Sequence, residues 1–366
     1  MNSSLYTLTN YLKQAAAFVK LSFAPNLSRC SMGLNFTVDE THENVVYWSL
    51  HVITAVTVPI DLLTVYLLWK KSPKQSVYYR QLLLALQICC LLIELHMGAL
   101  FAPILLFPLI GVYSQGLLAQ IQFPPHFSVV LFYFLVLDCF IILNICVFYR
   151  HQSILPSGHS LKLANKKSRN ILYSLYAISL ESMCISVIFS GYDESPGGSE
   201  YLEKNHPAMM WLVEKESWVV YDPNSSTRLV VYHVILCLAF AVPIFFLLIR
   251  HIHVLLKSRV ADMSSRTLAY HRAMVNSLIM QSLCWLSLCG PVAVLIASFL
   301  LETIPHEITS VVQLVAQIFP LLNALTVLLN TPTIRKTIRS YLPFHSNSIS
   351  PKMSIVPLRA GFSQFS

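Results

Sequence analysis

Four acidic residues interrupt long apolar segments of this 366-residue chain: Asp61, Glu94, Asp138 and Glu181. An ionised carboxylate within a membrane costs roughly 2.5–3.5 kcal/mol on insertion scales, so each acid should be protonated or face the polar interior of a helix bundle. Carboxyl groups held there can bind a ligand or exchange partners when helices move. The same groups can instead form interhelical hydrogen bonds that only hold the bundle together.

The position of each polar residue along its segment suggests its role. Glu94 and its neighbour His96 fall near the middle of one segment, and Asp138 near the middle of the next. We interpret these three as ligand-binding or switch residues, and Glu181 as structural. Five polar residues nearer the outer face are expected to line a cavity between helices, the usual place for a small ligand, although each could be a core or interfacial residue: Tyr133, Tyr232, His233, Gln313 and Gln317.

A second set of residues is suited to conformational switching. Asp61 and Asn323 lie at comparable depth in the first and last segments and are expected to join a polar network, either as a switch or as packing. Trp285 and Pro291 share one segment, and proline is a common cause of kinks and hinges in membrane helices. Two further prolines predict hinges for the same reason: Pro243 and Pro320.

Catalytic and metal-binding patterns are missing from the sequence. It contains no H-E-x-x-H, nucleophile or C-x-x-C motif and no Cys/His zinc spacing. His251 and His253 form an H-x-H pair without a third ligand, so we interpret them as residues of the cytoplasmic interface. Eight of the nine cysteines lie in apolar segments, where they should pack as small apolar side chains; Cys30 is the exception. We predict no metal, no cofactor and no enzymatic activity.

The amino-acid composition indicates that most of the chain lies in a lipid bilayer. Hydrophobic residues make up 55% of the chain and charged residues only 11%, whereas soluble domains carry about 25% charged residues. A net charge of +8 would suit nucleic acid, but the basic residues sit in short loops between apolar segments, where they determine membrane topology. We therefore expect lipid, and no nucleic acid, as a partner.

Seven segments are long enough to cross a hydrocarbon core of about 30 Å, which takes roughly 20 helical residues. They cover residues 46–69, 81 to the prolines at 103 and 108, 126–149, 171–191, 229–249, 274–301 and 309–330. The mildly apolar stretch 107–123 is short and rich in Gly and Gln, so we interpret it as an extracellular cap. The predicted fold is an all-α membrane protein with a seven-transmembrane bundle over residues 46–330. Residues 1–45 form an extracellular segment and 331–366 a cytoplasmic tail.

The charges of the loops predict the orientation of the bundle. The loops and tail on one side hold 19 of the 25 Lys and Arg residues, which the positive-inside rule assigns to the cytoplasm. All four N-x-[ST] sequons, the acceptors of lumenal glycosylation, lie on the opposite side: Asn2, Asn26, Asn35 and Asn224. The N-terminus is therefore predicted outside and the C-terminus in the cytoplasm. Residues 333–341 alternate apolar and basic positions and predict a short amphipathic helix on the inner leaflet.

Several runs resemble a known family. They are His51-Val-Ile-Thr with Pro59-Ile, Lys71-Ser-Pro-Lys74, Glu94-Leu-His96 with Pro103, Phe107-Pro-Leu109-Ile-Gly-Val-Tyr113-Ser-Gln-Gly116, Tyr149-Arg150-His151-Gln152, and Asn330-Thr-Pro332 with Arg335. This pattern is similar to that of nematode serpentine chemoreceptors, most of all class I, with the related class H next. The similarity is spread over nearly all the spans.

The resemblance implies a G-protein-coupled chemosensory receptor in the plasma membrane, in the ciliary membrane of sensory neurons. By position, Arg150 takes the role of the arginine that ends span three in rhodopsin-like receptors, although Tyr149 replaces the usual preceding acid. The N-P-x-x-Y pattern is missing from span seven, and no cysteines are placed for the usual disulfide to the long external loop.

We therefore expect a receptor for a small environmental ligand that couples to a heterotrimeric G protein through basic loops, with Arg150, Arg250 and Arg272 at the interface. A seven-span ion channel or transporter is the alternative, and a membrane enzyme a third. The loop charges oppose the inverted orientation of insect-type odorant channels, and no repeated halves indicate a transporter.

Overall fold

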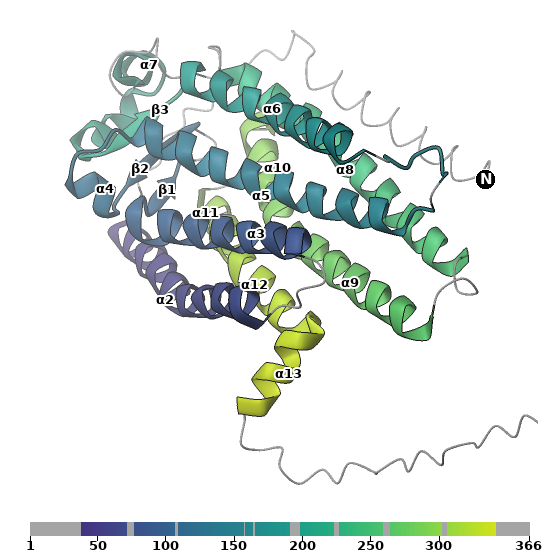
Figure 1. Cartoon of the computed structure of the whole chain (residues 1–366). Coiled ribbons are helices and arrows are strands. Elements are labelled where there is room, and N and C mark those ends of the chain that lie inside the picture. The colour runs from purple at the N-terminus through teal and green to yellow at the C-terminus, as the bar shows by residue number, and fades with distance from the viewer. Residues whose placement is uncertain are drawn as a thin grey trace, which may run out of the picture.

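The chain folds into a bundle of long helices with a small sheet at one end (Figure 1). The computed structural model describes residues 38–71, 77–106, 109–156, 158–163, 165–190, 198–222, 227–258, 264–301 and 306–341. The bundle helices are α2 (Glu40–Lys71), α3 (Val77–Leu95), α5 (Pro125–Ile154), α6 (Lys166–Ser190), α8 (Thr227–Ser258), α9 with α10 (Ser265–Cys284 and Leu286–Leu301), and α11 with α12 (His306–Gln317 and Phe319–Asn330). Each of the seven predicted spans overlaps one of these helices or helix pairs, which confirms the predicted bundle.

The bundle has the polarity of a protein folded in lipid. Five stretches of the described residues combine the length and hydropathy needed to cross a bilayer: Glu40–Lys70, Val77–Leu100, Pro125–Ile154, His271–Val294 and Ile308–Asn330. Helix α2 indicates a lipid solvent, because four polar residues in its middle are buried while several large apolar residues are exposed. The buried ones are Thr54, Thr57, Asp61 and Thr64, whereas Trp48, Val52 and Trp69 are 63%, 60% and 70% exposed.

Three of the spans are not continuous α-helices. Helix α3 gives way at Leu95 to a π-helical turn, η2 (His96–Leu100). Span six breaks at Trp285, whose N–H is shared between the carbonyls of Gln281 and Ser282 at 3.3 and 3.2 Å. Span seven breaks after Gln317, just before Pro320. Pro243 and Pro291, in contrast, lie inside uninterrupted helices, so the break in span six lies at Trp285 and not at the proline.

A three-stranded antiparallel sheet covers the end predicted to be extracellular. Its strands are β1 (Pro103–Leu105), β2 (Gly111–Ser114) and β3 (Trp218–Val220), in the order β1-β2-β3. The sequence predicts helices alone, so the sheet departs from that prediction. Its third strand comes from the long loop between spans four and five, far along the chain from the other two strands. Residues 109–123 do not cross the bundle, consistent with a cap, and they include the short helix α4 (Leu117–Gln120).

The cap has a hydrophobic core of its own. Helix α7 (Ser199–Asn205) and the 3-10 helix η4 (Pro207–Glu214) supply Leu202, Met209 and Leu212, each 0% exposed. They pack in one cluster with Ile104 of β1 and Leu50 at the outer end of α2. The long external loop is therefore packed onto the bundle by apolar contacts that need no disulfide.

After span seven, the chain forms α13 (Pro332–Tyr341), a helix over the residues where the sequence predicts one. Proline is favoured at a first helical position because it has no N–H to leave unpaired. Ile334 is 0% exposed and belongs to the main hydrophobic core, together with the partly buried Ile338. The apolar face expected on the inner leaflet thus packs at least in part against the bundle, while Arg335 is exposed.

Candidate functional site

The buried carboxyl of Glu94 is the centre of a polar cluster beneath the cap. Glu94 is 0% exposed, and the Thr54 hydroxyl of α2 donates a 2.7 Å hydrogen bond to its Oε1. Its Oε2 atom is buried without a hydrogen-bond partner. The Gln317 side chain, at the end of α11, is its neighbour from the seventh span. Three helices thus meet at a carboxyl that retains one open hydrogen-bonding position.

Two of the predicted ligand residues connect this cluster to the cap and to α5. His96 lies on the π-helical turn, donates from Nε2 to the Ser128 carbonyl at 2.9 Å, and leaves Nδ1 buried without a partner. Gln313 of α11 donates to the Pro103 carbonyl of β1 at 2.6 Å, and its Oε1 is also unpaired. Both side chains are at least 98% buried. The structure therefore brings Glu94, His96, Gln313 and Gln317 to the same outer part of the bundle.

Gly98 allows the π-helical turn to approach α2 closely. A Cβ at this position would collide with the Oγ1 of Thr54, the same hydroxyl that donates to Glu94. It would also lie 3.2 Å from the Leu50 carbonyl. A glycine is therefore required here by space, since any side chain would displace the hydrogen-bond donor of the buried carboxyl.

Two of the predicted switch residues, Asp61 and Asn323, are joined through Gln87, which the sequence did not single out. Gln87 of α3 donates to Asp61 Oδ1 at 2.8 Å and accepts from Asn323 Nδ2 at 3.2 Å. Asn323 Nδ2 also lies 3.4 Å from the Cys90 sulfur, which is 3.8 Å from that of Cys139. All five side chains are at least 99% buried. A connected network thus links α2, α3, α12 and α5, with Asp61 Oδ2 unpaired.

Trp285 connects the break in span six to spans three and seven. Its ring centroid lies 5.4 Å from that of Phe140 on α5 and 5.0 Å from that of Phe319 on α12. Phe319 follows the break in span seven and is 0% exposed. Pro291, also buried, lies within α10. The two helix breaks therefore pack against each other through aromatic rings.

The remaining predicted ligand residues are not brought to Glu94 by any described contact. Asp138 of α5 faces the Glu181 side chain of α6. Tyr133 and His233 are partly exposed on α5 and α8, and Tyr232 is 37% exposed. These residues remain predictions as parts of a ligand cavity.

The three arginines predicted at the cytoplasmic interface differ in exposure. Arg150 is 3% exposed, and its guanidinium lies 3.6 Å from the ring centroid of Tyr79 on α3. Arg250 and Arg272 are exposed. Arg272 and Lys257 line a hollow of about 370 Å³ between α8 and α9. This hollow offers a partner two basic side chains, whereas Arg150 is covered.

His251 and His253 also differ in their surroundings. The Nδ1 atom of His251 lies 2.8 Å from Nε2 of His151 on α5, so an imidazole pair joins spans three and five. His253 is exposed and lines the hollow beside Lys257. Among the described residues no group of three or more His, Cys, Asp or Glu side chains is arranged to hold a metal ion.

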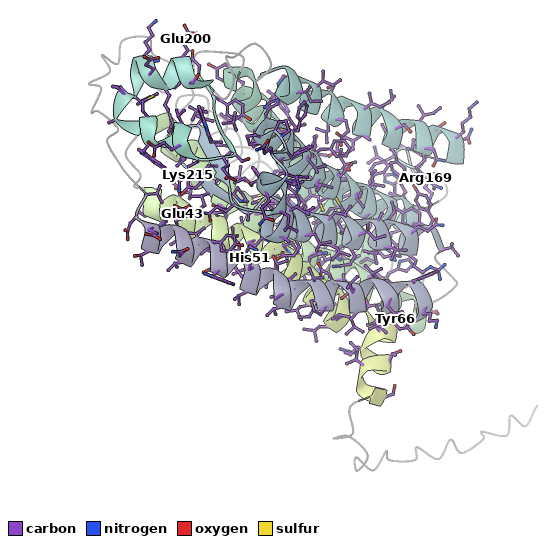
Figure 2. The ribbon with its side chains drawn as sticks, turned by 90° about the vertical axis from the view of Figure 1, so that its left-hand side faces the viewer. Glu43, His51, Tyr66, Arg169, Glu200 and Lys215 are labelled. Carbon is purple, nitrogen blue, oxygen red and sulfur yellow. The ribbon has the colours of Figure 1, made fainter. Side chains whose placement is uncertain are left out.

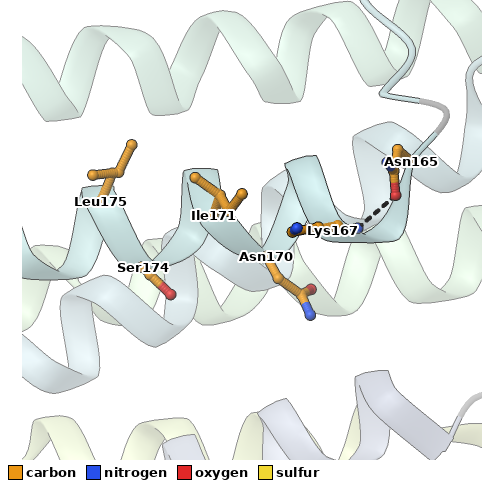
Figure 3. Close-up of a pocket in the computed structure, with 6 residues that line it drawn as sticks. All are labelled: Asn165, Lys167, Asn170, Ile171, Ser174 and Leu175. Atoms are coloured by element: carbon orange, nitrogen blue, oxygen red, sulfur yellow. Dashed lines mark hydrogen bonds between the residues drawn. The ribbon is translucent and has the colours of Figure 1, made fainter.

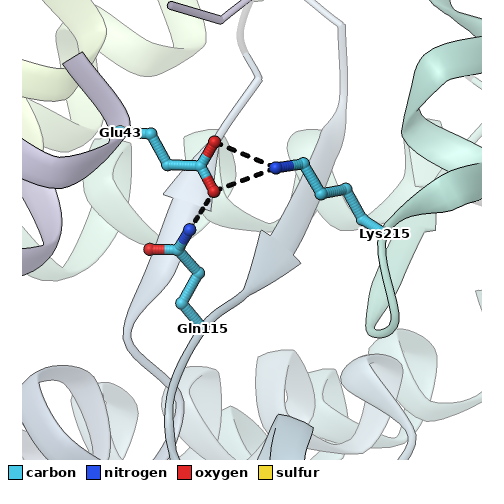
Figure 4. A network of polar contacts seen from close by, with 3 residues as sticks. All are labelled: Glu43, Gln115 and Lys215. Carbon is cyan, nitrogen blue, oxygen red and sulfur yellow. Dashed lines mark hydrogen bonds and ion pairs between the residues drawn. The ribbon is translucent and has the colours of Figure 1, made fainter. Parts of the chain in front are cut away.

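An ion pair fastens the external loop to the first span at the sheet end of the bundle (Figures 2 and 4). Lys215 Nζ lies 3.0 Å from both carboxylate oxygens of Glu43, and Gln115 donates to the same carboxylate. These groups border an open hollow of about 380 Å³ that also contacts Tyr113. Burial, with a smaller contribution from Glu43, raises the pKa of the Tyr113 hydroxyl well above its usual range, so that the hydroxyl stays neutral.

A second contact holds the external loop to span three. His126, at the outer end of α5, lies with Nδ1 2.9 Å from the Tyr221 hydroxyl, directly after β3. The Tyr221 N–H in turn donates to the Ile110 carbonyl at 2.8 Å. Hydrogen bonds therefore join the start of span three to the loop between spans four and five.

The largest of the described hollows lies away from all of these clusters. It has a volume of about 610 Å³ and is a shallow surface along the start of α6, lined by Lys167, Asn170 and Ile171 among others (Figure 3). The side chain of Asn165 accepts from the backbone N–H of Lys167 at 2.8 Å. None of the predicted site residues lines this hollow. The four predicted sequons lie outside the described residues.

Comparison with known proteins decides the family. The family model described as "Serpentine type 7TM GPCR chemoreceptor Sri" matches residues 36–338. The chain belongs to this family. A crystal structure of squid rhodopsin is similar with a TM-score of 0.55 and 13% identity, over 87% of this chain and 90% of that chain, which shows a shared fold. No curated protein matches the chain.

This serpentine chemoreceptor is therefore a membrane receptor of the G-protein-coupled type, with a seven-transmembrane bundle. The resemblance found in the sequence is confirmed at the level of the family. A receptor family also agrees with the absence of catalytic motifs from the sequence. The part of the bundle beneath the sheet carries the polar cluster around Glu94, and the opposite end carries the exposed basic residues of α8 and α9.

Proposed function

We propose that this receptor binds a small environmental molecule and responds by opening its cytoplasmic face to a heterotrimeric G protein. The observation that supports this most directly is the convergence of α2, α3 and α11 on Glu94, whose Oε2 is buried and unpaired. Buried polar groups are ordinarily satisfied, and an open one in a bundle interior is a position that a ligand's polar group can occupy. His96, Gln313 and Gln317 complete the proposed contacts. Tyr133, Asp138, Tyr232 and His233 remain candidate cavity residues.

The same helix carries the proposed signal inward. Glu94 and Gln87 are seven residues apart on α3 and so share one face. A ligand that shifts Glu94 would therefore shift Gln87, which bridges Asp61 and Asn323. The ligand works by population shift, because it favours whichever arrangement of the helices binds it more tightly. The aromatic contacts of Trp285 extend the path to span six.

The proposed G-protein contacts lie at the cytoplasmic ends of α8 and α9. Arg250, Arg272 and Lys257 are exposed there and would meet an acidic partner surface. Arg150 is the third arginine of this interface, but it must leave its covered position first. We place the receptor in the plasma membrane, in the ciliary membrane of sensory neurons, and within class I of the serpentine receptors, as the sequence runs suggest.

A ligand screen with paired variants tests this proposal. Cells that express the receptor with an accessory G protein are exposed to a panel of small organic molecules, and nucleotide exchange is recorded. For an active molecule, Glu94→Gln should reduce potency at least tenfold, whereas Glu203→Gln on the exposed face of α7 should leave it unchanged. Surface labelling of an N-terminal tag verifies expression and the predicted orientation.

Two outcomes would contradict the proposal. Equal potency in both variants would remove Glu94 from the ligand site. A ligand-driven current that persists without any G protein would favour the alternative of a seven-span channel.

A further inference from the structure

The guanidinium of Arg150 lies against an aromatic ring of a neighbouring span. Its central carbon is 3.6 Å from the ring centroid of Tyr79, and both side chains are 3% exposed. A guanidinium stacked this closely on a tyrosine face, away from water, is a strong form of cation–π contact. The sequence places tyrosine, not an acid, directly before Arg150, so the ring of Tyr79 takes a place that a carboxylate could otherwise hold.

Further rings and cations extend this contact across three helices. Tyr149 stacks on Tyr79 with the ring centroids 6.0 Å apart and the planes 14° apart, and it lies 5.3 Å from Tyr78. Arg169 at the start of α6 lies 6.0 Å from the Tyr149 ring. Arg150 and Arg169 are thus placed at the two ends of a stacked aromatic group contributed by α3 and α5. His271 of α9 also faces Arg150, so span six is part of its surroundings.

We propose that Tyr79 is a positioning residue that holds Arg150 out of reach of the cytoplasmic partner. In this arrangement the Tyr79 ring favours the inactive receptor, and activation requires the guanidinium to leave the ring. The effect on activation rests on the proposed G-protein coupling, whereas the covering of Arg150 rests on its contact with Tyr79 alone. Buried cation–π contacts correspond to roughly a tenfold to thirtyfold change in an equilibrium, which is the expected effect of removing the ring.

Chemical accessibility of Arg150 tests the contact without a ligand or a G protein. The purified full chain is treated with phenylglyoxal, an arginine reagent, and modification of each arginine is followed by peptide mass spectrometry. Tyr79→Leu should raise the rate at Arg150 about tenfold, whereas Tyr79→Phe, which keeps the ring and loses the hydroxyl, should match the wild type. Exposed Arg250 is the internal control and should react equally in all variants. If Tyr79→Leu does not fold, Tyr79→Met serves as the ring-free variant.

The modification rate at Arg150 and the rate of nucleotide exchange together separate the positioning role from the proposed function. The ring-free variant should also raise ligand-independent nucleotide exchange about tenfold, and Tyr79→Phe should not. An unchanged rate at Arg150 in the ring-free variant overturns the positioning role. A raised rate at Arg150 with no change in nucleotide exchange supports the contact and counts against G-protein coupling through Arg150.

Discussion

Gln87 and Gln281 offer a matched test of whether the buried network stabilises this receptor. Both glutamines are 0% exposed. Gln87 donates to Asp61 and accepts from Asn323, whereas neither amide atom of Gln281 has a hydrogen-bond partner. The two substitutions Gln87→Leu and Gln281→Leu are chemically identical and equally buried. Any difference between them therefore reports the hydrogen bonds and not the change in side-chain type.

The magnitudes follow from what each substitution leaves behind. Gln87→Leu strands an Asp61 oxygen and weakens the pairing of Asn323, and each stranded buried group costs about 1–3 kcal/mol. We expect a loss of about 2–4 kcal/mol in the free energy of unfolding. Gln281→Leu removes an amide that is already unpaired, which should be neutral or stabilising by about 1 kcal/mol.

Thermal unfolding of the purified full chain in detergent measures both effects. With roughly 2–4 °C per kcal/mol for domains of 150–250 residues, Gln87→Leu should lower the Tm by about 4–16 °C. Asp61→Asn combined with Gln87→Leu should be less destabilising than the sum of the single changes, because the two residues interact directly. Equal Tm shifts for the two glutamine variants would refute the reasoning, since the network would then contribute nothing beyond burial.

Three further outcomes are expected. Gly98→Ala should lower the Tm and the yield of folded receptor, because the new Cβ collides with Thr54. A Tm equal to that of the wild type would show that α2 moves away from the new Cβ without loss of stability. Lys215→Ala should change the Tm little, because its partly exposed ion pair with Glu43 contributes about 1 kcal/mol or less to stability. It should speed proteolysis of the external loop, and this difference in rate from the wild type should disappear in 1 M salt. Arg272→Ala should reduce ligand-driven nucleotide exchange at unchanged surface expression, and full activity would remove Arg272 from the G-protein interface.

Residue type and depth in the sequence predicted that particular polar residues are buried in the bundle. Glu94 and His96 were chosen because a polar residue in the middle of an apolar span must face the interior, and both are buried there. The partners Thr54 and Gln87 were missed, although a signal existed. Residues 54, 57, 61 and 64 recur at helical spacing as polar positions in an otherwise apolar span, which marks a buried polar stripe.

Other features of the structure carried no signal in the sequence. The pairing of Tyr113 with Trp218 joins strands more than a hundred residues apart, and strands of three or four residues leave little alternation to recognise. The stacking of Arg150 on Tyr79 likewise depends on how α3 and α5 rotate against each other. Loop charge predicted that Arg150 would face the cytoplasm, but charge cannot reveal that a ring from another helix covers it.

By itself the sequence determined the membrane class and the number and order of the spans, because hydropathy over twenty residues and loop charge are properties of local segments. The receptor family was indicated by short runs of residues that resemble it. Only the tertiary structure decided which polar groups meet. Glu94 finds Thr54 forty positions earlier, and Asn323 finds Gln87 across the bundle. Such pairs form when whole helices pack, since in lipid a buried polar group is satisfied by whichever neighbouring helix presents a partner.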